Sequence, residues 1–206
     1  MKKLVSLLVL ALAVNTMATT IQITEWMYKG TNGEYIELTN LGITTIDMTG
    51  WSYADSSAKA GDVSLSAFGI INPGESVILT DATAAAFISA WNLSSSVKVI
   101  GGNTKDNLGN GDAINIYDAS GTLIDTLTYG TTPKTDSKSC TIPQADLTLT
   151  TASSSWTLAS VGDVYGSWKS SGGDIGNPGT YYAAVPEPAT LFILGAAAMV
   201  LRFRKR

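Results

Sequence analysis

The sequence predicts an all-β domain built as a β-sandwich. Short segments of alternating polar and apolar residues recur between residues 21 and 129, and turn residues separate them at intervals of about eight to twelve positions. Within this region, only residues 82–91 have the apolar spacing of a helix. Many short strands with regularly spaced turns are typical of two sheets packed face to face.

Alternation locates the first strands. Residues 21–27 place Ile21, Ile23 and Met27 on one face, and residues 34–40 form the next strand after a Gly-rich turn. Further strands are expected at residues 45–48, 51–53, 67–71 and 75–80.

A short helix and a hairpin complete the clearly patterned region. Asp81 is expected to cap a helix over residues 82–91. Residues 97–100 form a short β-branched strand, and residues 112–117 and 122–129 form a hairpin.

The pattern weakens after Gly130. Residues 131–155 are rich in Ser and Thr, and within them only residues 147–149 are expected to form a strand. The aromatic segments 156–159 and 165–168 are expected to anchor irregular chain onto the sandwich.

The N-terminus has the composition of a signal peptide. Lys2 and Lys3 precede an apolar run over residues 4–14, and small residues follow up to Ala18. We therefore expect signal peptidase to remove residues 1–18 after Ala18, which places the body of the protein outside the cytoplasm.

The C-terminus combines a Pro-Glu-Pro motif (Pro186, Glu187 and Pro188) with an uncharged apolar run over residues 189–201. As a helix this run is roughly 20 Å long, shorter than a bilayer core of about 30 Å, so spanning requires the flanking basic side chains to snorkel. The basic cluster, expected on the cytoplasmic side, contains Arg202, Arg204, Lys205 and Arg206. We expect a transmembrane helix that anchors the protein.

Between the two ends lies one acidic domain, expected over residues 19–179, with a linker at 180–185 and the tail at 186–206. Residues 19–185 contain 16 Asp and Glu against 7 Lys, a net charge of −9, and no Arg. Nucleic-acid binding is therefore not expected, because phosphate contacts need clustered Lys and Arg.

The composition argues against most catalytic chemistry. The chain has no histidine, which excludes Ser-His-Asp and Cys-His catalysis and His-ligated zinc. The single Cys140 is expected to be a small buried side chain. Glu34 and Glu37 point to opposite faces of their strand, so we expect a turn role for Glu34 and a solvated or amide-bound Glu37. We assign no catalytic residue, cofactor or metal; a hydrolase that uses carboxylates alone is the weakest alternative.

Three other features are candidates for binding or packing. Trp26, Trp51 and Trp168 are candidate glycan contacts, although large aromatic side chains more often pack in a core. The Asn- and Asp-rich loop 103–112 could hold Ca²⁺, although such loops are also ordinary turns. Asp125 interrupts its strand and is expected to face solvent or a loop amide.

The order of Pro-Glu-Pro, apolar helix and arginine-rich end over residues 185–206 resembles the PEP-CTERM sorting signal of Gram-negative bacteria. The resemblance implies processing by an exosortase, a membrane-embedded transpeptidase-like protease. It also implies a place on the cell surface or in the biofilm matrix, beside exopolysaccharide.

The body resembles the lamin-tail domain, an immunoglobulin-like β-sandwich of secreted bacterial proteins. The segments that carry this resemblance are residues 23–28, 33–40, 46–52, 71–79, 111–118 and 125–130. The family implies a fold and no single activity. Our first hypothesis is therefore a non-catalytic exported surface or biofilm-matrix protein. The alternative is a carbohydrate-binding module that recognises the cell's own exopolysaccharide.

Overall fold

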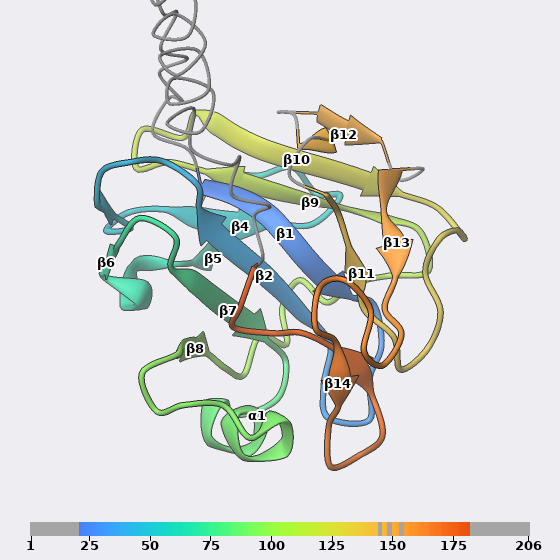
Figure 1. Cartoon of the computed structure of the whole chain (residues 1–206). Helices are drawn as coiled ribbons and strands as arrows, with labels where there is room; N and C mark the ends of the chain where they lie inside the picture. Colours follow the sequence, from blue (N-terminus) through green and yellow to red (C-terminus); the bar gives the residue numbers. More distant parts are fainter. Residues whose placement is uncertain (1–20, 144–145, 148–149, 153–154, 182–206) are drawn as a thin grey trace, which may run out of the picture.

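Two β-sheets packed face to face form the domain in the computed structural model, which describes residues 21–143, 146–147, 150–152 and 155–181. The chain is mostly β, as the sequence predicts, and the two sheets are visible as layers in Figure 1.

Within the described residues, one sheet has six strands in the order β13-β11-β1-β2-β7-β8 and the other has five in the order β12-β10-β9-β4-β5. The six-stranded sheet contains β1 (Ile21–Met27), β2 (Tyr35–Asn40), β7 (Ser76–Thr80), β8 (Lys98–Ile100), β11 (Cys140–Thr141) and β13 (Thr157–Leu158). The five-stranded sheet contains β4 (Ser52–Ala54), β5 (Val63–Ser64), β9 (Asp112–Tyr117), β10 (Leu123–Tyr129) and β12 (Thr150–Ala152).

The described residues also form two small ribbons and two helical segments. The ribbons pair β3 (Ile46–Asp47) with β6 (Ile70–Ile71), and β14 (Trp168–Lys169) with β15 (Ile175–Gly176). The helical segments are the 3-10 turn η1 (Ser66–Phe68) and the helix α1 (Ala84–Trp91). Strands β1, β2 and β7 pair antiparallel, whereas β8 returns parallel to β7 after α1.

The main core lies between the two sheets. Trp26 of β1 is fully buried there and stacks on Tyr129 of β10, with ring centroids 4.1 Å apart. Trp156 meets Trp26 edge-on at 6.2 Å. Aromatic contacts between strands distant in sequence therefore hold the two layers together.

A β-bulge changes the face that the end of β1 presents. The register of β1 against β2 shifts between Ile23 and Glu25, and an extra residue in one strand reverses the alternation beyond it. As a result Trp26 joins Ile21 and Ile23 in the main core, and Met27 packs on the opposite side of the sheet. The prediction that Met27 shares a face with Ile21 and Ile23 is therefore wrong.

Helix α1 covers the other side of the six-stranded sheet. Phe87 and Trp91 are buried against Tyr35, with ring centroids 5.3 and 5.9 Å from it. The helix cap is Thr83, whose hydroxyl accepts the amide of Ala86 at 3.3 Å, so the prediction of Asp81 as cap is wrong.

The region after Gly130 contains more regular structure than the sequence pattern predicts. Its short strands extend both sheets, and β11 lies beside β1 (Figure 1). The strand expected at 147–149 is displaced, because β12 covers Thr150–Ala152 and residues 148–149 lie outside the described ones. The expected anchoring role of Trp156 is confirmed, since it is 4% exposed within the main core.

Both ends of the chain lie outside the described residues. This applies to the signal peptide with Ala18, to the Pro-Glu-Pro motif, to the apolar run 189–201 and to the basic cluster. Among the helices in the described ranges, none has the length and apolar character needed to cross a membrane.

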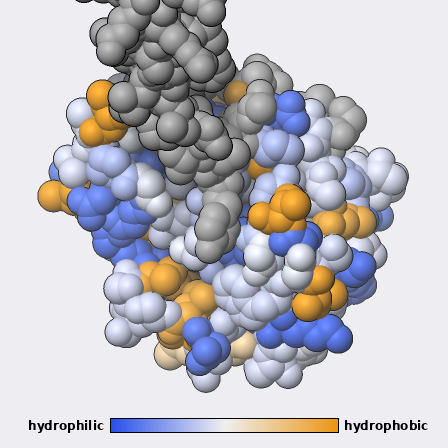
Figure 2. Space-filling view, in the orientation of Figure 1, coloured by the Kyte–Doolittle hydropathy of each residue, from blue (hydrophilic) through white to orange (hydrophobic). Residues whose placement is uncertain are grey.

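The surface of the domain is mixed in polarity. Figure 2 shows the apolar residues of one face in separate patches among polar ones. Large hydrophobic side chains that are exposed in the described chain come from different loops and strand ends: Ile43, Ile70, Leu123, Val161 and Val164. Scattered apolar residues of this kind are normal for a protein surface.

The buried side chain of Asp125 links the two sheets. Its register in β10 is irregular, and its buried carboxylate accepts the amide of Ile23 in β1 at 2.8 Å and that of Thr126 at 2.8 Å. The prediction that Asp125 faces solvent or a loop amide is therefore wrong. Next to the bulge of β1, the hydrogen bonds between neighbouring strands do not provide an acceptor for the amide of Ile23. The carboxylate of Asp125 provides that acceptor.

We predict that Asp125→Ala lowers the free energy of unfolding by about 1–3 kcal/mol, because the Ile23 amide loses its partner in a buried position. Urea unfolding measures the change. The matched control is Asp136→Ala, which removes an ion pair between side chains that are more than half exposed and should cost less than about 1 kcal/mol. Equal losses in the two variants would contradict the bridging role.

Candidate functional site

The most elaborate polar arrangement of the domain fastens its C-terminal segment to the six-stranded sheet. Glu25 of β1 and Glu37 of β2 are paired in the register, and both side chains are fully buried. Glu25 Oε1 accepts the backbone amide of Asn177 at 2.8 Å, and Glu37 Oε2 accepts that of Gly179 at 2.7 Å. We call these two carboxylates and the segment 175–179 the C-terminal clamp.

Hydroxyl groups supply the remaining partners of the clamp. Glu25 Oε1 also accepts the hydroxyl of Ser139 at 2.5 Å, and Glu37 Oε1 accepts that of Thr24 at 2.6 Å. Thr24 continues through Thr39 as a chain of buried hydroxyls. Glu25 Oε2, in contrast, has no hydrogen-bond partner among the described residues.

Burial controls the protonation of the two carboxyls. Desolvation raises the pKa of Glu25 strongly, and the neighbouring charge of Glu37 raises it further. Desolvation also raises the pKa of Glu37, although its hydrogen bonds oppose the shift. The pair therefore retains protons at pH values where exposed carboxyls are ionised.

Further contacts fix the chain on both sides of the clamp. Asp174 accepts the amides of Thr31 and Asn32 at 2.9 and 2.8 Å, which ties the β14–β15 ribbon to the turn between β1 and β2. The hydroxyl of Tyr181 donates to the carbonyl of Ile142 at 2.9 Å. The described chain is thus anchored up to its last residue, and residues 182–185 separate that anchor from the Pro-Glu-Pro motif.

The clamp brings together two carboxylates, a pair that could suggest a hydrolase. The sequence places Glu34 and Glu37 on one strand, but the neighbour of Glu37 in space is Glu25. Both are 0% exposed beneath the C-terminal segment, and their oxygens accept main-chain amides and hydroxyls. This arrangement holds the backbone of the C-terminal segment in place.

Glu34 and Cys140 have structural positions. The sequence predicts a turn role for Glu34, whereas its buried carboxylate accepts the amide of Leu108 at 2.8 Å and fastens the loop before β9. Burial raises the pKa of Glu34 to about 8. Cys140 is 1% exposed in the main core, as predicted, and burial raises the pKa of its thiol to about 12.

The three tryptophans predicted as glycan contacts have different environments. Trp26 is fully buried between the sheets, so it has no surface on which a sugar could stack, and that prediction is wrong. Trp51 is half-buried and packs against the main core. Trp168 is half-buried at the edge of the second cluster and lines a surface hollow.

The loop 103–112 is stabilised by its own hydrogen bonds. Asp112 accepts the amides of Gly109 and Ala113, and the side-chain amide of Asn103 donates to the carbonyl of Asp106. Within the described residues, no three acidic, His or Cys side chains are grouped so that they could hold a metal ion. The hydrogen bonds of this loop are those of ordinary Asn- and Asp-rich turns.

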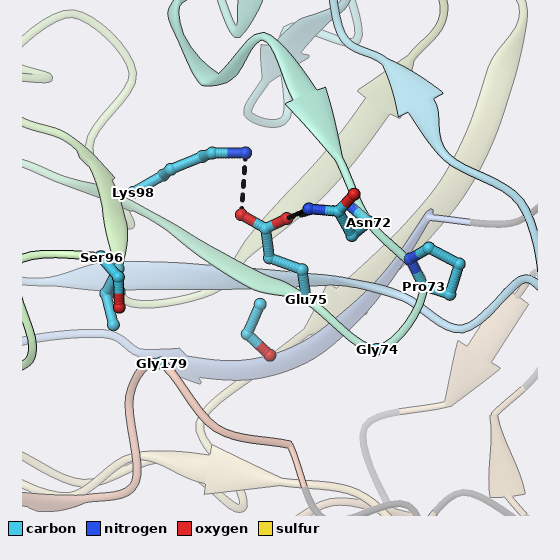
Figure 3. Close-up of a pocket in the computed structure, with 9 residues that line it drawn as sticks. Asn72, Pro73, Gly74, Glu75, Ser96, Lys98 and Gly179 are labelled. Carbon is cyan, nitrogen blue, oxygen red and sulfur yellow. Dashed lines mark hydrogen bonds and ion pairs between the residues drawn. The ribbon is translucent and has the colours of Figure 1, made fainter.

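Another surface hollow, of about 520 Å³, adjoins the clamp at Gly179. Figure 3 shows Glu75 between Lys98 and Asn72 on one side of this hollow. Glu75 forms an ion pair with Lys98 at 2.8 Å and accepts the side-chain amide of Asn72 at 2.8 Å. The polar groups of this hollow are therefore already paired with one another.

Comparison with known proteins agrees with this architecture. A family model described as the lamin tail domain matches residues 15–131, and a model described as the PEP-CTERM protein-sorting motif matches residues 184–206. No curated protein matches the chain. Strands β11 to β15 and the clamp segment lie beyond the range of the lamin-tail match.

The domain is a two-sheet β-sandwich, and its C-terminal segment 175–179 is hydrogen-bonded to the buried carboxylates of the six-stranded sheet. The chain belongs to the lamin-tail domain family, because the family model covers more than half of it. The second match identifies an exported protein that carries a PEP-CTERM motif and is sorted by an exosortase.

We predict that Gly176→Ala lowers the free energy of unfolding by about 1–3 kcal/mol. A Cβ at this position would lie 2.9 Å from both Glu25 Oε1 and Ser139 Oγ and would also contact the hydroxyl of Tyr35. Thermal unfolding measures the effect. Gly130→Ala is the matched control, because a Cβ there meets nothing within 4 Å; a Gly176→Ala variant as stable as this control would contradict the close packing of the clamp.

The buried carboxyls also predict how stability depends on pH. A carboxyl with a pKa raised on folding binds more protons in the folded state, so stability falls as pH rises between the two pKa values. Burial raises the pKa of Glu34 from 4.5 to about 8 and that of Asp125 from 3.8 to about 7, and the clamp pair shifts in the same direction. We therefore expect stability to decrease between about pH 4.5 and pH 8.

Glu25→Gln tests the contribution of the clamp to this pH dependence. The carboxamide keeps an oxygen for Ser139 and Asn177 and places its NH₂ where Oε2 has no partner. The slope of stability against pH should become less steep by up to about 1.4 kcal/mol per pH unit. Asp136→Asn, at an exposed site, is the control, and an unchanged slope in Glu25→Gln would contradict the raised pKa.

Proposed function

We propose that this protein is a non-catalytic component of the cell surface or of the biofilm matrix, delivered there by exosortase sorting. The observation that carries the proposal is the order of parts: a β-sandwich, an anchor at Tyr181, and then the match to the sorting motif at residues 184–206. In this proposal the β-sandwich is the part that is delivered to the surface, and residues 182–206 direct its delivery.

The tail suggests how sorting proceeds. Pro186 and Pro188 disfavour helix, so Glu187 and its neighbours present extended backbone before the apolar run 189–201 begins. That run inserts into the membrane as a helix, and the basic cluster keeps the end of the chain in the cytoplasm. The exosortase then reaches the extended segment at the outer side of the membrane.

The non-catalytic role is supported by the chemistry of the domain. The chain has no histidine, and its buried carboxylates accept amides that hold loops, strands and the clamp.

We predict that replacing Pro186, Glu187 and Pro188 together with alanine leaves export intact and stops removal of the tail, because the extended segment becomes helical. The measurement is the intact mass of the protein recovered from native cells. Wild-type protein should lack its C-terminal tail, and the variant should end at Arg206.

Two controls accompany this experiment. Pro73→Ala changes an exposed proline of the domain and should be processed as the wild type is. A strain without exosortase activity should leave both proteins uncut. Continued processing of the triple-alanine variant would contradict the role of the motif.

A further inference from the structure

A surface hollow of about 540 Å³ lies between the end of α1 and the β14–β15 ribbon. Its lining consists of Ser89, Ala90, Trp91, Asn92, Trp168, Lys169, Ser170 and Ser171. We call it the Trp168 groove. Its volume is within the range of about 300–1,000 Å³ that small-molecule sites occupy.

Two hydrogen bonds hold the walls of the groove together. The indole Nε1 of Trp168 donates to the carbonyl of Trp91 at 3.2 Å, and the amide of Ser171 donates to the carbonyl of Ala90 at 2.8 Å. The rings of Trp91 and Trp168 meet edge-on, with centroids 6.0 Å apart and an interplanar angle of 85°. The half-buried Trp168 ring is thus held in one orientation before any ligand arrives.

The rim of the groove carries polar groups that are not engaged. The side chains of Ser89, Asn92 and Ser171 are exposed and make no hydrogen bond to another described residue, and the ammonium of Lys169 forms no ion pair there. Asn92 is held in the left-handed conformation that ends α1, with φ of 50°. Hydroxyl and carboxamide side chains therefore line the same hollow as Trp168.

The other hollows described in this structure lack that combination. In the hollow beside Gly179, Glu75 is paired with Lys98. In the hollow beside β5, Asp62 is paired with Lys105 at 2.9 Å. The hollow beside Gly33 is lined by a turn and the start of α1, without an aromatic side chain.

The side chains that line the Trp168 groove favour one class of ligand over the others. A purely apolar ligand would leave the rim hydroxyls and carboxamide without partners. An anion would find only one cation lining the groove, Lys169, in a domain whose net charge is negative. A neutral saccharide has apolar C–H faces that stack on an indole ring and hydroxyl groups that bond to Ser and Asn side chains.

We propose that the Trp168 groove is a binding site for a neutral glycan, with the ring of Trp168 as its stacking surface and Ser89, Asn92 and Ser171 as its hydrogen-bonding rim. This site requires neither the tail nor its processing. Sorting and glycan binding therefore succeed or fail separately.

The test uses the full chain in a detergent without a sugar headgroup, titrated by calorimetry with cellohexaose, laminarihexaose, chitohexaose and a linear α-glucan. At least one neutral oligosaccharide should bind, and Trp168→Ala should weaken that binding about tenfold or more. If all four probes fail to bind the folded protein, the proposal is overturned.

Rim variants keep the test independent of any folding defect in Trp168→Ala. Ser171→Ala retains the backbone bond to Ala90, and Asn92→Gly retains the left-handed backbone while it removes the carboxamide. Each should weaken binding by about threefold to tenfold with unchanged thermal stability. Ser96→Ala, in the hollow beside Gly179, should bind as the wild type does; binding that all these variants leave unchanged would place the glycan elsewhere and overturn the assignment.

Discussion

Two buried carboxylates that accept main-chain amides organise the C-terminal third of this domain. Glu25 and Glu37 lie side by side on neighbouring strands, and the amides of Asn177 and Gly179 bond to them. A buried carboxylate is costly unless donors surround it, so the sheet is complete only when the segment 175–179 covers it. In turn, the backbone amides of Asn177 and Gly179 find their hydrogen-bond acceptors in these side chains of the sheet. The clamp therefore joins residues beyond the lamin-tail match to the strands within it.

The same principle recurs across the molecule. Asp125 holds an amide of the opposite sheet, Glu34 holds the loop before β9, and Asp174 holds the turn between β1 and β2. Acidic side chains thus accept main-chain amides at several irregular positions of the chain. This use explains how a domain with many short strands keeps its loops in place, and why so much of its acidic character lies inside. Beside α1, the exposed side chains of Ser89, Asn92 and Ser171 line the Trp168 groove and have no hydrogen-bond partner among the described residues.

The sequence was sufficient to predict the features that depend on local pattern. Alternation located β1, β2, β7 and the β9–β10 hairpin, because a strand with one buried face repeats every second residue. It did not predict the bulge after Ile23, which depends on the partner strand, and so it assigned Met27 to the wrong face. The strands β11 to β15 have two or three residues each, too few for a pattern, and distant contacts position them. The sequence pattern does not distinguish Trp26 from Trp168 as a candidate glycan contact. The fold does, because it buries Trp26 and leaves Trp168 lining a groove.

The most direct test of this account is hydrogen exchange of the amides of Asn177 and Gly179 in the native protein, followed residue by residue by NMR. If Glu25 and Glu37 hold this segment, both amides should exchange as slowly as the amides of β2, because all of them open only when the six-stranded sheet opens. Exchange as fast as that of the exposed turn at Ser120 would show that the segment detaches on its own and would contradict the clamp.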